Sequence, residues 1–152
     1  MRIGVISDTH GLLRPEAAQL LTDVEYILHA GDIGSADVIA ALKRIAPTTA
    51  VRGNVDTGNW AKGLAETETV QLGGRTIHIL HNLKELDRDP VESGFDAVIS
   101  GHSHRPKIET IEGILYLNPG SAGRRRFSLP ITLATLELGE RAIRPEIHEL
   151  AD

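Results

Sequence analysis

The chain has 152 residues, a formal net charge of −5 and no cysteine, and 41% of its residues are hydrophobic. This length and composition are typical of one soluble globular domain, so we expect a single domain over residues 1–152. The negative charge argues against binding a nucleic-acid polymer through its phosphates, and the absence of cysteine excludes disulfides and thiolate metal ligands.

The sequence starts directly with a strand-like segment at residues 1–6, where a signal peptide would otherwise stand. No apolar run is long enough to span a bilayer. We therefore expect a cytoplasmic protein with no membrane partner. The sequence leaves the oligomeric state open, with a homo-oligomer among the alternatives.

Short apolar runs alternate with helical patterns in the first part of the chain. The runs at residues 2–7, 25–30 and 48–52 predict strands, and each ends at a polar turn. Helices are expected from Pro15 to about Leu21, because proline suits a first helical turn, and after an N-cap at Ser35 up to Ile45. This order predicts a parallel sheet with crossover helices. Residues 54–66 have no period and are expected to form a functional loop.

Strand patterns dominate the rest of the chain. A glycine pair at 73–74 predicts a hairpin between residues 69–72 and 75–80, and another strand is expected at 95–100. A short helix is expected near residues 83–92. We expect the last four strands to form a second, more antiparallel sheet, giving two stacked sheets with helices outside; these strands lie at 107–111, 113–117, 131–138 and 142–148.

Side chains that can bind a metal follow five of the expected strands: Asp8 and His10, then Asp32, Asn54, His81, and finally His102 and His104. Ligands bind at this edge of α/β sheets because strand ends and their loops converge there. In an extended segment, His102 and His104 would share one face. Three of the candidates directly follow a glycine that allows close backbone approach, at Gly31, Gly53 and Gly101.

Oxygen and imidazole ligands without sulfur favour Mn²⁺, with Ni²⁺, Fe²⁺ or Zn²⁺ as alternatives. Seven side chains are too many for one ion, but with one bridging carboxylate they supply four bonds to each of two ions. Two ions about 3.5–4 Å apart can hold a phosphoryl group and lower the pKa of a shared water. The pattern therefore predicts hydrolysis of a phosphate ester with two divalent ions as cofactors.

The order and spacing of these residues resemble the calcineurin-like metallophosphoesterase superfamily, whose pattern is Asp-x-His, Gly-Asp, Gly-Asn, His and Gly-His-x-His. The compact length and the turn at residues 118–121, Asn-Pro-Gly-Ser, are similar to the small single-domain phosphodiesterase branch. The resemblance implies an α/β four-layer sandwich, in which two mixed sheets pack face to face with helices on both outer faces.

The resemblance also implies roles for the seven candidates. Asp32 would bridge two metals, and a metal-bridging hydroxide would be the nucleophile. The first metal would be held by Asp8, His10 and His104, and the second by Asn54, His81 and His102. Asp32, Asn54 and His81 are the predicted catalytic residues.

Two positions depart from the family pattern. Val55 stands where many relatives have a histidine that is a candidate general acid. Two alternatives follow here: water protonates the leaving group, or the enzyme favours leaving groups that need little help. Asn82 stands where glycine usually follows the histidine. We expect Asn82 to preserve a left-handed turn, because asparagine tolerates that conformation.

Predicted substrate contacts are Asn54, Arg52, Gly120, Ser121 and Arg124. For Arg52, pairing with a neighbouring carboxylate is an equal alternative. For the arginine run at 124–126, the alternative is that the charged side chains lie in solvent and contact no substrate.

Four further side chains have expected roles outside the ligand set. Asp56 is expected either to support a ligand or to form a local turn. His29 is expected to be structural, and His78 and His148 to face solvent or the sheet surface.

The predicted function is a metal-dependent phosphodiesterase whose partner is a small phosphodiester or nucleotide-like substrate. One alternative is a phosphomonoesterase, which the absent Asp-Arg-Gly and His-Glu motifs of protein phosphatases disfavour. The other is a non-catalytic interaction scaffold, like the retromer subunit of the same fold. Retention of all seven ligand types disfavours that alternative.

Overall fold

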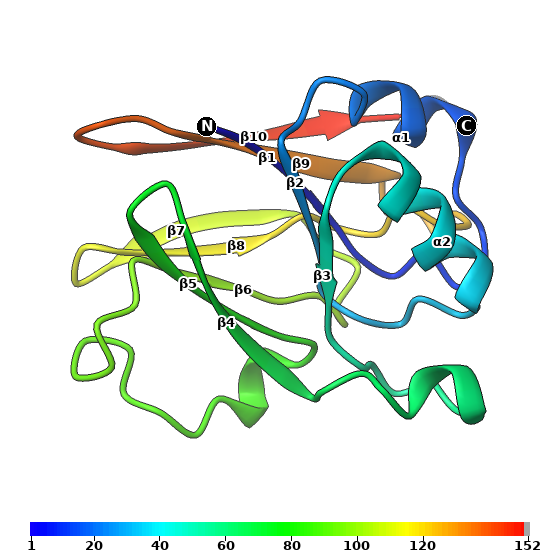
Figure 1. The fold of residues 1–152 in the computed structure, drawn as a ribbon, viewed down its shortest axis with the longest axis horizontal. Coiled ribbons are helices and arrows are strands. Elements are labelled where there is room, and N and C mark those ends of the chain that lie inside the picture. The colour runs from blue at the N-terminus through cyan, green and yellow to red at the C-terminus, as the bar shows by residue number, and fades with distance from the viewer. Residues whose placement is uncertain (151–152) are drawn as a thin grey trace.

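A computed structural model describes residues 1–150, which form two five-stranded sheets packed face to face (Figure 1). The strand order is β10-β9-β1-β2-β3 in the first sheet and β4-β5-β6-β8-β7 in the second, and each sheet mixes parallel and antiparallel pairs. The predicted fold of two mixed sheets is confirmed. The elements are β1 (Arg2–Ile6), α1 (Pro15–Leu20), β2 (Tyr26–His29), α2 (Ala36–Ile45), β3 (Thr48–Ala50), β4 (Thr67–Leu72), β5 (Arg75–Leu80), β6 (Ala97–Ile99), β7 (Lys107–Ile111), β8 (Ile114–Asn118), β9 (Thr132–Leu138) and β10 (Ile143–Glu149).

The main core lies between the two sheets. Ile3 and Val5 of β1 point into it and meet residues of the second sheet such as Ile77 and Ile79, all fully buried. Ile6 belongs to the other face of the first sheet, as the two-residue period of a strand requires. Both faces of β1 are therefore covered, which fixes the position of the loop that follows it.

Both α-helices cover the outer face of the first sheet (Figure 1). Leu21, Val38 and Leu42 pack there, and Trp60 of the 54–66 loop packs against the same cluster. The helix expected at 83–92 is wrong, because only a 3-10 turn forms at Leu83–Glu85. Loop residues cover the outer face of the second sheet instead, so helical cover on this side is confined to that single turn within residues 1–150.

The last third of the chain does not form one sheet, as the sequence patterns had suggested. β7 and β8 join the second sheet beside β6, whereas β9 and β10 extend the first sheet, with Ala134 of β9 opposite Val5 of β1. Local alternation specifies a strand and its buried face but not its partner, which non-local packing decides.

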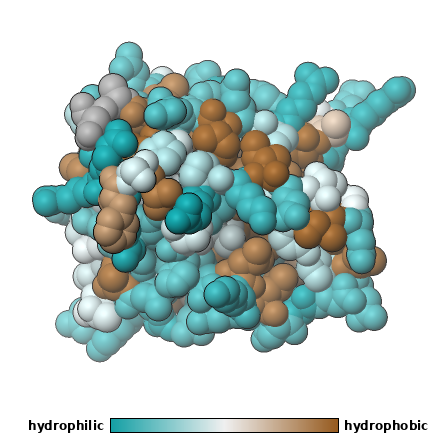
Figure 2. All heavy atoms as spheres, turned by 180° about the vertical axis from the view of Figure 1, so that it is seen from behind, coloured by the Kyte–Doolittle hydropathy of each residue, from teal (hydrophilic) through white to brown (hydrophobic). Residues whose placement is uncertain are grey.

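The rear of the molecule is covered mostly by hydrophilic side chains, with hydrophobic ones in small groups (Figure 2). None of the helices among residues 1–150 has the length and apolar character needed to cross a bilayer.

Candidate metal centre

The loops after β1, β2, β5 and β6 meet at one edge of the two sheets. Backbone hydrogen bonds connect them: the Asp8 N–H donates to the Gly31 carbonyl at 3.0 Å, and the His10 N–H donates to the Asp32 carbonyl at 3.0 Å. The Gly101 N–H donates to the His81 carbonyl at 2.9 Å. These bonds hold the loops in a fixed relation, and with them the candidate ligands that the loops carry.

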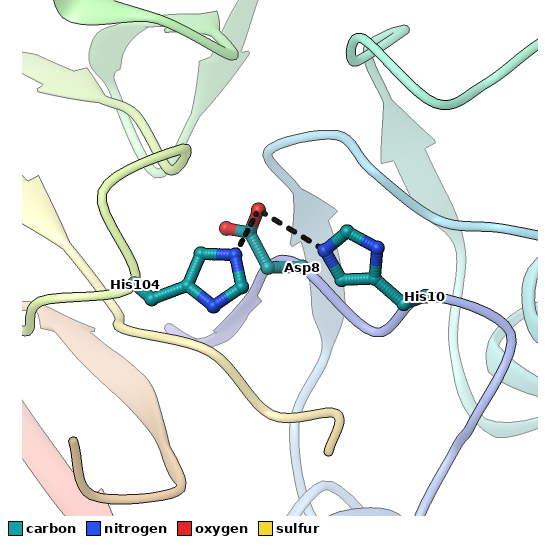
Figure 3. A group of neighbouring side chains, drawn as sticks. All are labelled: Asp8, His10 and His104. Carbon is teal, nitrogen blue, oxygen red and sulfur yellow. Dashed lines mark ion pairs between the residues drawn. The ribbon is translucent and has the colours of Figure 1, made fainter. Parts of the chain in front are cut away.

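Asp8, His10 and His104 form a first group of possible metal ligands (Figure 3). Both imidazoles point at the Asp8 carboxylate, with Oδ1 lying 3.4 Å from His104 Nε2 and 3.8 Å from His10 Nε2. Asp8 and His104 are buried, whereas His10 is exposed. The group is therefore anchored in the protein and reached by solvent on the His10 side.

Asp8 also belongs to a second group, with Asp32 and His81. His81 Nε2 lies 3.1 Å from Asp32 Oδ2 and 4.0 Å from Asp8 Oδ1. The other nitrogen, Nδ1, donates to the Ala30 carbonyl at 2.8 Å. That bond leaves the Nε2 lone pair directed at the carboxylates, as in histidines that ligate metals.

The donor atoms of these groups fit a divalent cation. Asp8 Oδ1 and His81 Nε2 are both buried and have no hydrogen-bond partner. Buried polar atoms are normally paired, and a cation placed between the Nε2 lone pair and the carboxylate oxygens would satisfy both. Carboxylate and imidazole donors without sulfur suit Mn²⁺, Fe²⁺, Ni²⁺ or Zn²⁺.

Electrostatics favour the ionised form of Asp32. Burial acts to raise the pKa of this carboxyl group, but the contact with His81 and the hydrogen bond from the Val55 N–H outweigh it and lower the pKa to about 2. The same contact raises the pKa of His81 against the lowering effect of its burial. Asp32 is therefore an anion at neutral pH, ready to neutralise a cation.

The structure separates the two histidines of the Gly101–His104 turn. The His104 ring lies 5.4 Å from that of His10, whereas the His102 ring is exposed and lies 5.2 Å from that of His81. The prediction that His102 and His104 lie in extended backbone is wrong, because their φ angles are 72° and 62°. Asn54 is also exposed, and it lines a polar cavity together with His81. His102 belongs to neither ligand group, and the ligand role of Asn54 stays a prediction.

Left-handed backbone is concentrated at the site. Seven non-glycine residues among those described have positive φ, and five of them are candidate ligands: Asp8, His10, Asp32, His102 and His104. Such conformations cost about 1–3 kcal/mol each and tend to cluster at functional sites. Asn82 is not among them, because its φ is −112°, so the expected left-handed turn at Asn82 is wrong.

Two of the glycines are required by close approach between loops. A Cβ on Gly53 would overlap the backbone nitrogen and Oδ1 of Asp32, and one on Gly101 would overlap Ser7 Oγ and come within 2.7 Å of Asp8 Oδ2. Each glycine therefore lets one loop lie directly on the carboxylate of another.

Three polar residues hold the ligand loops. The buried Asp56 carboxylate accepts from the N–H groups of Ile33 at 3.2 Å, Gly34 at 2.9 Å and Gly53 at 2.8 Å, joining the loops after β2 and β3. Ser7 Oγ donates to Asp8 Oδ2 at 2.7 Å, and Ser121 Oγ donates to the Asp8 carbonyl at 3.0 Å. Sequence reasoning missed Ser7, because a serine at a strand end carries no specific signal.

The predicted substrate contacts differ in their burial and in their partners. Arg52 pairs with Glu66 at 3.0 Å, which is the alternative foreseen for it. Gly120 and Ser121 are buried, and the Gly120 N–H donates to Asn118 Oδ1 at 2.9 Å. Arg124 is exposed. Their roles toward a substrate stay predictions.

The three remaining histidines lie outside both groups. His78 is buried, stacked 4.5 Å from the Phe95 ring, and its Nδ1 lies 2.8 Å from Thr69 Oγ1, so it does not face solvent. His148 is half-buried and lies 2.8 Å from Thr135. His29 is structural, as expected.

The hydrogen bonds of His29 need the neutral ring. Its Nδ1 accepts from the Gly31 N–H at 3.1 Å, and its Nε2 lies 3.0 Å from Thr9 Oγ1, whose own hydrogen goes to the Ile33 carbonyl. Nε2 therefore donates, and a second proton at Nδ1 would face an N–H. Burial lowers the pKa of His29 to about 4, although the carboxylates of Asp8, Asp56 and Asp32 oppose the shift.

We expect the metal-free protein to lose stability as the pH falls from 7 to 5. The unfolded chain takes up a proton on His29 near its ordinary pKa, whereas the folded chain does not, so this residue should reduce the free energy of unfolding by about 2 kcal/mol. Urea unfolding at both pH values measures the loss. His29→Gln should show a smaller loss than the parent chain, and equal losses would contradict the assignment.

Comparison with known proteins points to one superfamily. A family model described as the calcineurin-like phosphoesterase superfamily domain matches residues 1–141. A probable metallophosphoesterase of Methanothermobacter thermautotrophicus is 35% identical over 93% of this chain and 88% of its own length. A phosphodiesterase of Methanocaldococcus jannaschii is 28% identical over 98% of this chain and 100% of its own.

Among solved structures, Chaetomium thermophilum Vps29 superposes with a TM-score of 0.84, covering 99% of this chain and 89% of that protein. At 18% identity, this likeness concerns the fold alone. The family match extends over nearly the whole chain and includes every loop that carries a candidate ligand. The chain therefore belongs to the calcineurin-like phosphoesterase superfamily.

Proposed function

We propose that the chain is a phosphodiesterase that hydrolyses small or nucleotide-like phosphodiesters with the help of two divalent ions. The observation that carries this proposal is that Asp8 belongs to both ligand groups, within each of which the ligand atoms lie within 4.8 Å of one another. The two groups therefore adjoin, and two adjacent cation sites suit an in-line displacement at phosphorus.

The proposed first ion lies at Asp8, His10 and His104, and the second at Asn54, His81 and His102. Asp32 is the proposed bridge. In support, Asp32 Oδ2 lies 3.8 Å from His10 Nε2 and 3.1 Å from His81 Nε2, and these histidines belong to different sets. Mn²⁺ is the first choice because of the carboxylate content, with Ni²⁺, Fe²⁺ and Zn²⁺ as alternatives.

When bound, the ions would supply positive charge to the phosphoryl oxygens and acidify a water molecule. The residues of the chain keep the ligands in place: Ala30 fixes the ring of His81, and the Val55 N–H holds Asp32 Oδ1 at 3.0 Å. The Val55 side chain is 47% exposed and has no proton to give. Solvent would then protonate the leaving group, so diesters with acidic leaving groups should react faster.

The test compares bis(4-nitrophenyl) phosphate with 4-nitrophenyl phosphate on the Mn²⁺-loaded protein, with the ions per chain counted by metal analysis. We expect two ions per chain and a higher kcat/KM for the diester. A higher kcat/KM for the monoester would favour the phosphomonoesterase alternative. Failure to cleave a panel of aryl and nucleotide diesters, with fewer than two ions bound, would favour the scaffold.

A further inference from the structure

A large cavity opens beside the metal centre, on the side of His102. Its volume is about 700 Å³, and its lining includes Gly101, His102 and Asn118. His102 is a candidate ligand, and the Asn118 amide donates to the Gly101 carbonyl at 2.9 Å, so the cavity begins where the candidate centre ends. A cavity of this size suits a small organic ligand.

The walls of the cavity are largely apolar. Leu83 lines it from the 3-10 turn, Pro106 from the loop before β7, Tyr116 from β8, and Leu129 from the loop before β9. A phosphate group would gain nothing from these side chains. A flat hydrocarbon or heteroaromatic ring would gain binding free energy, because it could leave water and lie against leucine side chains and the tyrosine ring.

The rim of the cavity is positive although the whole chain is negative. Lys84, Arg105 and Lys107 line it, and Lys107 pairs with Glu109 at 3.0 Å. Within residues 1–150, neither Lys84 nor Arg105 forms an ion pair with a carboxylate. An anionic ligand would therefore be attracted to this entrance.

The cavity on the other side of His81 is a poorer place for an organic group. Its volume is about 260 Å³, and its lining includes the acidic Glu66, Glu85 and Asp87. Arg52, which also lines it, is already paired with Glu66. The acidic lining thus directs the organic part of an anionic ester to the His102 side.

We propose that the cavity beside His102 binds a flat aromatic group of a phosphoester whose phosphate lies at the metal centre. The proposal rests on the proposed function, because that function places the phosphate at the metal centre. It narrows the substrate class to diesters with an aryl ring or a nucleobase, as opposed to simple alkyl diesters.

The test is calorimetric binding of 1-naphthyl phosphate and methyl phosphate to the Mn²⁺-loaded chain. We expect naphthyl phosphate to bind at least about tenfold more tightly, because its ring leaves water in the cavity. Leu83→Asp should reduce that preference to below about threefold; the added charge weakens the binding of both esters alike, so the ratio of their affinities is the quantity to compare.

Val91→Asp is the matched control. Val91 is 52% exposed and Leu83 is 41% exposed, both lie in the loop region between β5 and β6, and Val91 is not part of the cavity lining. We expect this variant to keep the full preference for naphthyl phosphate. Urea midpoints equal to that of the parent chain would show that both variants fold.

Adenosine 5′-monophosphate distinguishes the two sources of the ring. Affinity near that of naphthyl phosphate would assign the cavity to a nucleobase, and affinity near that of methyl phosphate would assign it to an aryl group. Equal binding of naphthyl and methyl phosphates, no binding of either, or an unchanged preference in Leu83→Asp would overturn the proposal. A naphthyl preference in a chain that cleaves no diester would instead refute the proposed function alone.

Discussion

Asp32→Asn should abolish phosphodiester hydrolysis while the metal-free protein still folds. An amide nitrogen placed at the Oδ2 position can donate to His81 Nε2, which lies 3.1 Å away and has no hydrogen-bond partner, while Oδ1 keeps the bond from the Val55 N–H. The charge that would bind the ions is lost. We expect kcat/KM to fall at least about 100-fold, with the metal-free free energy of unfolding lowered by about 2 kcal/mol at pH 7, because the contacts that lower the pKa of Asp32 stabilise its charged form in the folded chain.

Enzyme assays, metal analysis and urea unfolding with a chelator test this prediction. Asp37→Asn is the control, since Asp37 is an exposed carboxylate in the first turn of α2, and it should leave all three measurements unchanged. Activity of Asp32→Asn within threefold of the parent would contradict the bridging role. A metal-free stability equal to that of the parent would contradict the stabilising contacts assigned to the Asp32 charge.

Asp56→Ala should destabilise the protein and weaken metal binding together. It removes the acceptor of three backbone N–H groups and leaves those of Ile33 and Gly53 without the partner that joins their loops. We expect a loss of about 3 kcal/mol or more in the free energy of unfolding, because unpaired buried donors are costly. Urea unfolding and a Mn²⁺ titration measure the two effects.

The control for this variant is Asp89→Ala. The Asp89 carboxylate also accepts from backbone N–H groups, those of Val91 at 3.0 Å and Glu92 at 3.4 Å, but it lies in an exposed loop. Its loss should cost about 1 kcal/mol or less. Equal losses for the two variants would mean that Asp56 forms a local turn and nothing more.

The sequence predicted most of the strands and the candidate metal ligands that follow them. Apolar runs located the strands, the proline at residue 15 and the serine at residue 35 marked the starts of α1 and α2, and polar residues after the runs located the candidate ligands. These signals are local, because they depend on side-chain period and on turn chemistry. Because these signals are local, they predict where a strand lies better than they predict which strand it pairs with.

Other features depend on contacts between distant segments. β9 pairs with β1, from which it is separated by most of the chain, and no pattern within β9 specifies that choice. The left-handed conformations of Asp32 and His104 likewise depend on the surrounding loops, since aspartate and histidine tolerate positive φ better than most residues but rarely adopt it. Asp56 was a recognisable candidate, but its bonds to Ile33 and Gly34 required the fold.

The position of β9 has a consequence for synthesis on the ribosome. β1 can pair with β2 once residues 2–29 have emerged, but its other edge receives β9 only after residues 132–138 have been made. Until then the strand that carries Asp8 presents unpaired backbone groups on one side, the kind of edge at which chains associate. Ser121, which holds the Asp8 carbonyl, is also made late. The candidate metal centre would therefore be completed late in synthesis, after most of the fold is in place.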